Sequence, residues 1–431
     1  MRQNKETRGG THRRAPFFGA PAIHYMPMKI TRRIFALAVV AAPIFVFSFA
    51  KSATPPAAAA HPHYLALVGT YTTKTQSKGI YAYDFDPETG KLTDKGIAAE
   101  TPDPSWVIIH PNGKFAYAAN EAGKKSTISA FSLDAQSGKL KLLNDIPSLG
   151  EDPCYLSFDK RGDYLLVANY TSGTVAAFPI LPDGKLGEDV DMVKDAGPRG
   201  PDKNRQEGPH AHWVQVSEHN HYAYVADLGL DRILIYKFDE AKGSLTPGDT
   251  SSATTKAGTT KATNDSFTAV LAPGTGPRHA VFSRDGNFLY VLGEMKSNVT
   301  VLSNEARESF RSIQEISTLP ADFSGRNDAA EIALHPNGKW LYTSNRGHDS
   351  IAVFSVDQTT GKLALLADVP TRGKEPRHFA IDPTGHYLLA ENQNSDSIVE
   401  FHIDPTSGQP TQPIEVAHVP SPVCLVFYPV Q

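Results

Sequence analysis

The chain has 431 residues, a formal net charge of −4 and 20% charged residues. This length and composition predict a soluble globular protein with a large core. The charge balance has no basic excess, which argues against a nucleic-acid-binding protein.

The first 60 residues differ in composition from the rest and predict an N-terminal extension. Met28 begins a basic segment that contains Arg32 and Arg33, followed by an apolar run at 34–50 and a stretch of small residues. This order is typical of a secretory signal peptide. The pair of arginines resembles the signal of the twin-arginine export route. We therefore take Met28 as the start and expect export to the periplasm or the medium. The alternative is a membrane anchor, because a run of about 17 apolar residues lies at the short edge of a bilayer span.

Residues 61–431 repeat one pattern. Each copy has a small residue or proline, an apolar strand, a Pro/Asp-x-Gly turn, a second apolar strand that ends near Asn, and a third strand. The six best copies are PSWVIIHPNGKFAYAANE (104–121), PCYLSFDKRGDYLLVANY (153–170), AHWVQVSEHNHYAYVADL (211–228), PRHAVFSRDGNFLYVLGE (277–294), AEIALHPNGKWLYTSNR (330–346) and PRHFAIDPTGHYLLAENQ (376–393).

A seventh copy is split between the two ends of this region. Residues 422–429, PVCLVFYP, supply a first strand, and residues 63–93 supply later strands without a first one. Joining them closes a ring and leaves no free sheet edge. The sequence predicts an all-β fold, a seven-bladed β-propeller over 61–431 whose closing blade is built from both termini.

Three further features are interpreted as structural. Residues 245–272 are rich in Thr, Ala and Ser and predict a low-complexity loop between the third and fourth copies. The phrases DPETGKL, DAQSGKL, DQTTGKL and DPTSGQP predict polar hairpin turns after third strands. Cys154 and Cys424, the only cysteines, fall in apolar strands and are expected to be buried and unpaired.

Function in a propeller is expected where one copy departs from the others, because shared positions pack every blade. The start of each first strand lies beside the end of the second strand, and first strands are innermost. The residues at both places should therefore meet at the mouth of the central channel. The unusual residues there are His210, His212, Arg278, His279, Glu294, Arg346, Arg377 and His378.

Ion pairs that tie blades together, such as Arg278 with Glu294 or Arg346 with Asp349, are the structural alternative. Several charged groups at one channel mouth favour a ligand site, because burying charge is costly. Guanidinium groups match carboxylates or phosphates, and His and Glu transfer protons near neutral pH. The chain has no G-x-S-x-G and no H-E-x-x-H. These features predict a non-covalent reaction on a small acidic substrate, with arginine stabilising an oxyanion.

The phrases GPHAHW, GPRHAVFSRDGNFLYVLGE, SNRGHDSIAVFSVD and PRHFAIDPTGHYLLAENQNSDSI resemble the seven-bladed lactonase family. This family includes bacterial 6-phosphogluconolactonases and fungal carboxy-cis,cis-muconate cyclases. The resemblance covers roughly residues 62–430 and implies hydrolysis of a sugar δ-lactone, or a lactone-forming cycloisomerisation, without metal or cofactor. The histidine, two arginines and glutamate of the cycloisomerase branch match His210, Arg278, Glu294 and Arg346.

We therefore expect a monomeric lactone hydrolase that acts on a small anionic or sugar lactone. The expected catalytic residues are His210, Arg278, Glu294 and Arg346. The expected substrate-binding residues are His212, His279, Arg377 and His378. A muconate-type cycloisomerase, and a non-catalytic exported propeller that binds a protein or glycan, are the alternative hypotheses.

Overall fold

The computed structural model describes residues 63–188, 191–247, 268–304 and 309–430. The predicted signal peptide, its start at Met28 and the central part of the predicted low-complexity loop, 248–267, lie outside these residues. Within the described ranges, no helix is long and apolar enough to cross a membrane.

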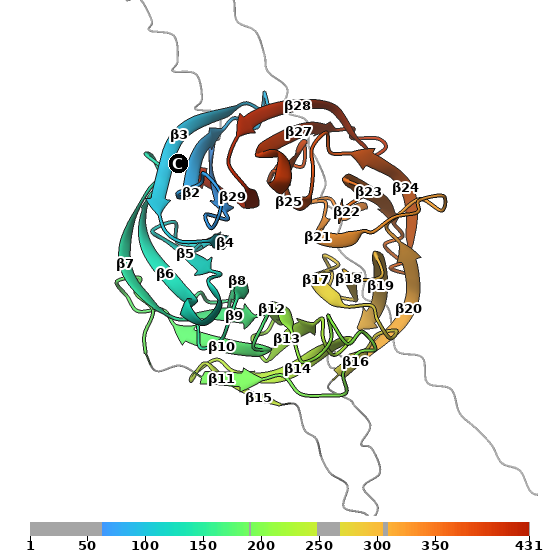
Figure 1. The fold of residues 1–431 in the computed structure, drawn as a ribbon, viewed down its shortest axis with the longest axis horizontal. Helices are drawn as coiled ribbons and strands as arrows, with labels where there is room; N and C mark the ends of the chain where they lie inside the picture. The colour runs from blue at the N-terminus through green and yellow to red at the C-terminus, as the bar shows by residue number, and fades with distance from the viewer. Residues whose placement is uncertain (1–62, 189–190, 248–267, 305–308, 431) are drawn as a thin grey trace, which may run out of the picture. The chain divides into compact units, whose positions relative to one another are not determined.

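The described strands form seven antiparallel sheets arranged as blades around a central channel, which confirms the predicted propeller (Figure 1). Their inner strands come from the repeated sequences, which alternate apolar and polar residues as half-buried strands do. Blade 1 contains β29 Pro422–Val430, β1 His63–Thr70, β2 Gly79–Phe85 and β3 Leu92–Glu100. Blade 2 contains β4 Pro104–Ile109, β5 Phe115–Asn120, β6 Thr127–Asp134 and β7 Lys139–Pro147, with the 3-10 turn η1 Gly123–Lys125. Blade 3 contains β8 Pro153–Phe158, β9 Tyr164–Asn169, β10 Thr174–Pro179 and β11 Asp191–Lys194.

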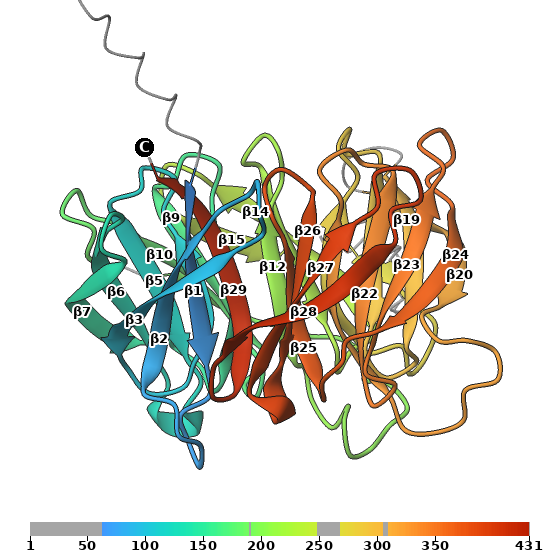
Figure 2. The same cartoon turned by 90° about the horizontal axis from the view of Figure 1, so that it is seen from above.

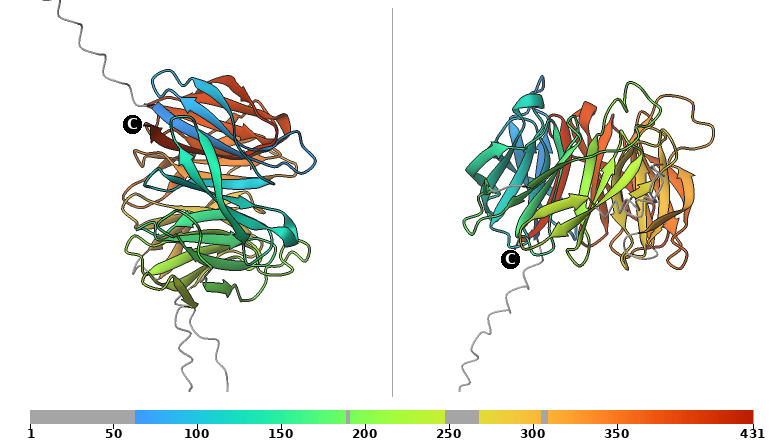
Figure 3. Two further views of the ribbon diagram at one scale, coloured as in Figure 1. Left: turned by 90° about the vertical axis from the view of Figure 1, so that its left-hand side faces the viewer. Right: turned by 90° about the horizontal axis from the view of Figure 1, so that it is seen from below.

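The remaining four blades follow in chain order, and Figures 2 and 3 show the same blades from the side. Blade 4 contains β12 Ala211–Val216, β13 Tyr222–Asp227, β14 Arg232–Asp239, β15 Ser244–Pro247 and β16 Thr268–Val270. Blade 5 contains β17 Pro277–Phe282, β18 Phe288–Gly293, β19 Asn298–Asn304 and β20 Phe310–Ser317. Blade 6 contains β21 Asp328–Leu334, β22 Trp340–Arg346, β23 Ser350–Val356 and β24 Leu363–Pro370. Blade 7 contains β25 Pro376–Ile381, β26 Tyr387–Asn392, β27 Ser397–Ile403 and β28 Pro410–His418, with the 3-10 turn η2 Gln393–Ser395.

Blade 1 joins the two ends of the propeller, as the sequence predicts. The C-terminal strand β29 is its innermost strand and pairs antiparallel with β1 from His63 opposite Val430 to Thr70 opposite Pro422. The ring is therefore closed by backbone hydrogen bonds rather than by side chains alone. Sheet closure of this kind removes the edges on which strands of other chains add.

Two details differ from the sequence pattern. Each repeat was expected to hold three strands, but every blade has a fourth, outer strand, such as β7 and β24. These outer strands are partly exposed, and they lack the buried apolar pattern that marks the inner ones: β7 exposes Lys139 and Lys141, and β24 exposes Ala364 and Leu366. The predicted loop 245–272 also begins and ends in strand, because β15 and β16 both pair with β14.

The predicted hairpin turns and the buried cysteines are confirmed. The aspartate carbonyl of each phrase accepts a hydrogen bond from the glycine amide, as at Asp86 and Gly90 and at Asp357 and Gly361. These glycines have φ near +72°, a conformation that glycine adopts without strain. Cys154 and Cys424 are both buried and unpaired.

The apolar core lies between neighbouring blades. Leu67 of β1 is fully buried in a cluster that also contains Val107 of β4 and Phe131 of β6. Such inter-blade packing fixes each sheet relative to the next, and therefore fixes the width of the channel.

We expect Leu67→Ala to lower the free energy of unfolding by about 2–5 kcal/mol, because it leaves a cavity between two blades. Leu142→Ala on the outer strand β7 is the matched control, since Leu142 is 55% exposed. Its effect should stay within about 0.5 kcal/mol. Urea denaturation of both variants measures the difference, and equal losses would contradict the inter-blade core.

Candidate active site at the channel mouth

A bulge near the channel-mouth end of every innermost strand leaves one residue out of the ladder in five blades, and two residues in β17 and β21, where His279 follows Arg278 and Glu331 follows Ala330. In β25, for example, Pro376 pairs with Asn392 and His378 with Glu391, so that Arg377 is the extra residue. Bulges re-aim side chains and recur beside active sites. The residues at the bulges are Val423, Ser105, Cys154, His212, Arg278, Ala330 and Arg377. These are the residues that open the first strands in the sequence alignment.

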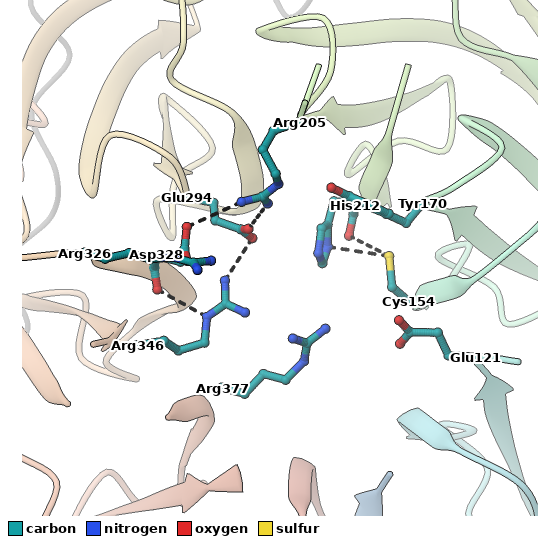
Figure 4. Close-up of a pocket in the computed structure, with 10 residues that line it drawn as sticks. All are labelled: Glu121, Cys154, Tyr170, Arg205, His212, Glu294, Arg326, Asp328, Arg346 and Arg377. Carbon is teal, nitrogen blue, oxygen red and sulfur yellow. Dashed lines mark hydrogen bonds and ion pairs between the residues drawn. The ribbon is translucent and has the colours of Figure 1, made fainter. Parts of the chain in front are cut away.

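A polar cavity of about 320 Å³ lies where these positions converge (Figure 4). Its volume is at the small end of the range for sites that bind small molecules. Six of the seven blades, or the loops that lead into them, contribute to its wall. The lining residues are Glu121, Cys154, Tyr170, Arg205, His212, Glu294, Arg326, Asp328, Arg346 and Arg377.

The carboxylate of Glu294, next to the end of β18, is the centre of the charged cluster. Its Oε2 lies 3.0 Å from Arg278 Nε and 3.1 Å from an Arg346 terminal nitrogen. Its Oε1 accepts a hydrogen bond from Arg205. The Arg278 Nε–H has no aligned hydrogen-bond acceptor, so its contact with Glu294 is chiefly electrostatic. Glu294 thus gathers three guanidinium groups from three different parts of the chain.

Electrostatics fixes the protonation of this cluster. Burial alone raises the pKa of Glu294, but Arg346, Arg278, His212 and Arg205 outweigh it and hold the pKa well below its usual range. Burial, with the charges of Arg346 and Arg377, lowers the pKa of Arg278 to about 10. At neutral pH Glu294 is therefore an anion and Arg278 a cation.

Arg377 differs from Arg205, Arg278, Arg326 and Arg346 because it has no carboxylate partner within ion-pair distance among the described residues. Its guanidinium carbon lies 5.3 Å from the centre of the Tyr71 ring. The Tyr71 hydroxyl donates instead to Glu121 Oε2 at 2.7 Å. Figure 4 shows the Arg377 side chain reaching into the cavity. A half-buried cation without an ion partner is the arrangement expected of an anion-binding group.

His212 is the histidine that lines the cavity. Its Nδ1 lies 3.5 Å from Cys154 Sγ. Burial, followed by the charges of Arg278 and His279, lowers the pKa of His212 well below its usual range, so the ring is neutral at neutral pH. Burial raises the pKa of the Cys154 thiol, so Cys154 is no thiolate nucleophile.

His210 lies next to the cavity wall rather than in it. Its ring stacks on Tyr170 with the centroids 4.6 Å apart, and its Nδ1 lies 3.0 Å from the Tyr170 carbonyl oxygen. Its Nε2 lies 3.3 Å from Glu207 Oε1. His210 thus supports Tyr170, which lines the cavity.

His279 and His378, also expected to bind substrate, belong to a second buried cluster that is not part of the cavity wall. His279 Nδ1 lies 2.9 Å from Glu331 Oε2, and His378 Nδ1 lies 2.7 Å from Glu391 Oε2. Trp106 contacts both rings edge-on, with its ring centre 5.3 Å from that of His279 and 5.4 Å from that of His378. Both histidines are therefore satisfied by carboxylates and an aromatic ring.

Sequence reasoning missed five polar lining residues. Glu121 and Tyr170 stand at the position after the second strand, so register alone marks them, although the sequence prediction took only Glu294 and Arg346 from that position. Asp328 is the first residue of β21, two residues before the aligned position. Arg205 and Arg326 come from loops outside the repeat, where no periodic signal exists. Arg346 does not pair with Asp349, which binds Lys374 instead.

The fold and the cavity define a propeller with a small, cation-rich site on its axis. No three His, Cys, Asp or Glu side chains in the described ranges are grouped to hold a metal ion. A family model described as "Lactonase, 7-bladed beta-propeller" matches residues 65–427. The chain therefore belongs to the lactonase family of seven-bladed β-propellers.

Individual relatives agree with this assignment. The chain is 35% identical to the 6-phosphogluconolactonase of Bacillus subtilis over 317 residues, 73% of this chain and 84% of the relative. A crystal structure of a putative 6-phosphogluconolactonase from Bacteroides fragilis superposes with a TM-score of 0.75 at 35% identity, covering 85% of this chain and 98% of that one. The periplasmic gluconolactonase of Pseudomonas aeruginosa has a TM-score of 0.75 at 32% identity, covering 85% and 99%.

We expect Glu294→Gln to destabilise the protein at neutral pH by about 3–5 kcal/mol, because it leaves buried guanidinium groups without their anion. The pKa of Glu294 is depressed on folding, so its contribution is present above the unfolded pKa of about 4.3 and fades as the pH falls. The difference between wild type and variant should therefore shrink from pH 7 to pH 3. Urea denaturation across this range measures it, with the exposed Glu100→Gln as control. A difference that grows on acidification would contradict the ionised state of Glu294.

Proposed function

We propose that this lactonase hydrolyses a sugar δ-lactone that carries an anionic group, with the cavity at the channel mouth as its active site. The observation that carries the proposal is the cluster of guanidinium groups around Glu294, with Arg377 left without an ion partner. A guanidinium group matches both the developing oxyanion of a lactone carbonyl and a fixed phosphate or carboxylate.

In the proposed reaction, water attacks the lactone carbonyl carbon and the carbonyl electron pair moves to oxygen. Arg346, which lines the cavity, stabilises that oxyanion, because Glu294 holds its guanidinium group in position. Arg278 does not line this cavity; it donates to the Ala330 carbonyl oxygen and supports Glu294 by its charge. The carbonyl then re-forms, the bond to the ring oxygen breaks, and the ring oxygen takes a proton. The product is the aldonic acid, which ionises at neutral pH.

His212 is the best candidate for proton transfer. It lines the cavity and is neutral, so it can accept the proton of the attacking water and return it to the ring oxygen. Glu294 suits this role poorly, because its two oxygens already face the guanidinium groups of Arg205, Arg278 and Arg346. We assign Glu294 and His210 to positioning, and Arg377 to the anionic group of the substrate.

Purified protein should open δ-lactones faster than buffer alone, and faster when the lactone carries a 6-phosphate. Arg346→Gln should lower kcat on the order of 10²–10³-fold, because it removes an oxyanion donor. Arg377→Gln should raise KM for the phosphorylated lactone and leave the unphosphorylated one unchanged. Acid release in a pH-stat, corrected for spontaneous hydrolysis, measures these rates.

Arg161→Gln is the matched control, because Arg161 is exposed and pairs with Glu240 outside the cavity. It should keep the rates of the wild type. If no lactone is turned over faster than by buffer, the proposed function is wrong. If Arg377→Gln affects both lactones equally, the assignment of Arg377 is wrong and the lactonase activity stands.

We further propose that residues 1–60 are an export leader, as the order of basic, apolar and small residues predicts. The periplasmic location of the Pseudomonas aeruginosa gluconolactonase supports export in this family. In a bacterial host, the exported chain should begin between residues 50 and 61 by mass spectrometry. Arg32→Lys with Arg33→Lys should keep the protein in the cytosol. Full-length protein in the cytosol of the wild-type strain would contradict the proposal.

A further inference from the structure

The loop 195–210 joins blade 3 to blade 4 and carries one side of the site. Arg205, within this loop, reaches Glu294 and also lies 3.5 Å from Asp328 Oδ1. His210 is its last residue before β12 and supports Tyr170. The loop contains no helix or strand of its own, so its two ends must be held by other contacts.

Two buried aspartates stand where the loop begins and ends. Asp195 is its first residue and is 2% exposed, while Asp227 at the end of β13 is fully buried. Asp227 Oδ1 accepts hydrogen bonds of 2.9 Å from the backbone amides of His210 and Leu230. Asp195 Oδ1 accepts a hydrogen bond of 2.5 Å from the Tyr236 hydroxyl of β14. Each aspartate thus has one oxygen fully engaged.

The second oxygen of each carboxyl group has no such donor. Asp195 Oδ2 and Asp227 Oδ2 are both buried without a hydrogen-bond partner among the described residues. The two side chains lie within hydrogen-bonding reach of each other. Two carboxylate anions in contact away from water repel strongly, whereas one proton between them satisfies both oxygens.

Nothing else near the pair supplies a compensating charge. The titratable groups that face it are the Tyr236 hydroxyl from β14 and the imidazole of His210. Arg232 on β14 donates to the carbonyl oxygens of Pro198 and Leu230. No lysine or arginine in the described ranges forms an ion pair with either carboxyl group.

We propose that Asp195 and Asp227 share one proton, and that this proton fastens the beginning of the loop 195–210 to its end. The connection runs from Asp195 through the proton to Asp227, and from Asp227 Oδ1 to the amide of His210. Neither aspartate lines the cavity, so both are positioning residues for Arg205 and His210.

The proposal sets a direction for pH dependence. Burial and the adjacent Asp227 charge raise the pKa of Asp195 well above its usual range. A raised acid pKa means that the folded state holds a proton which the unfolded chain releases near pH 4. The fastening is therefore complete at low pH and is lost as the pH rises through the folded pKa.

Hydrogen exchange of the amides in the loop 195–210, followed from pH 5 to pH 10, tests the pair directly. Protection in the wild type should fall with rising pH, approaching about tenfold per unit above the pKa of the pair. Asp195→Asn should keep its protection at every pH, because its amide donates to Asp227 Oδ2 without a titrating proton. Asp195→Ala should lose protection at every pH. Asp183→Asn, an exposed substitution in blade 3, is the matched control and should follow the wild type.

The effect on turnover rests on the proposed function, whereas loop protection does not. If the protein is a lactonase, Asp195→Asn should extend the alkaline limb of its pH profile and Asp195→Ala should raise KM. If the loop amides of the Asp195→Asn variant exchange as fast as those of the Asp195→Ala variant, the shared proton is overturned. Asp195→Ala that keeps the loop protection of the wild type overturns it as well. If the protection of the loop changes with pH as predicted but the protein turns over no lactone, only the proposed function is overturned.

Discussion

The pairing of β29 with β1 is the constraint on which the site depends. Backbone hydrogen bonds between the two ends of the chain bring seven inner strands around one axis. Residues that are more than two hundred positions apart, such as Glu121 and Arg377, therefore line one cavity. An open row of blades would leave these side chains in solvent, where ion pairs contribute little. Closure thus gives the charged cluster its low-dielectric surroundings.

Within the closed ring, one carboxylate organises the site. Glu294 draws Arg205, Arg278 and Arg346 together, and their charges keep it ionised despite its burial. Such a preorganised arrangement needs little rearrangement when negative charge develops on a substrate. Arg377 stays outside this network, so its charge is available for a ligand. Three guanidinium groups are therefore paired with Glu294, whereas the guanidinium group of Arg377 has no carboxylate partner among the described residues.

The sequence predicts the architecture because the inner strands repeat with a clear apolar alternation and regular turns. It also identifies Arg278, Glu294, Arg346 and Arg377, since they depart from positions shared by the copies. The outer strands were missed because exposed strands lack that alternation. Arg205 was missed because it lies in a loop outside the repeat. His279 was assigned to the site because aligning the repeats shows the register of a residue but not the depth of its side chain in the channel. The depth of the His279 side chain in the channel depends on the bulge in β17, and no residue of the repeat indicates that bulge.

The recurring bulge has a further consequence for how this architecture changes over time. Each innermost strand has at least one residue that the hydrogen-bond ladder does not use, and the seven blades hold residues as different as Val423, Ser105, His212 and Arg377 there. Exchanging these residues alters the polarity of the axis without altering strand pairing. Point substitutions at these positions can therefore change the chemistry at the axis without disturbing the sheets, as Cys154, His212 and Arg377 on the cavity wall illustrate.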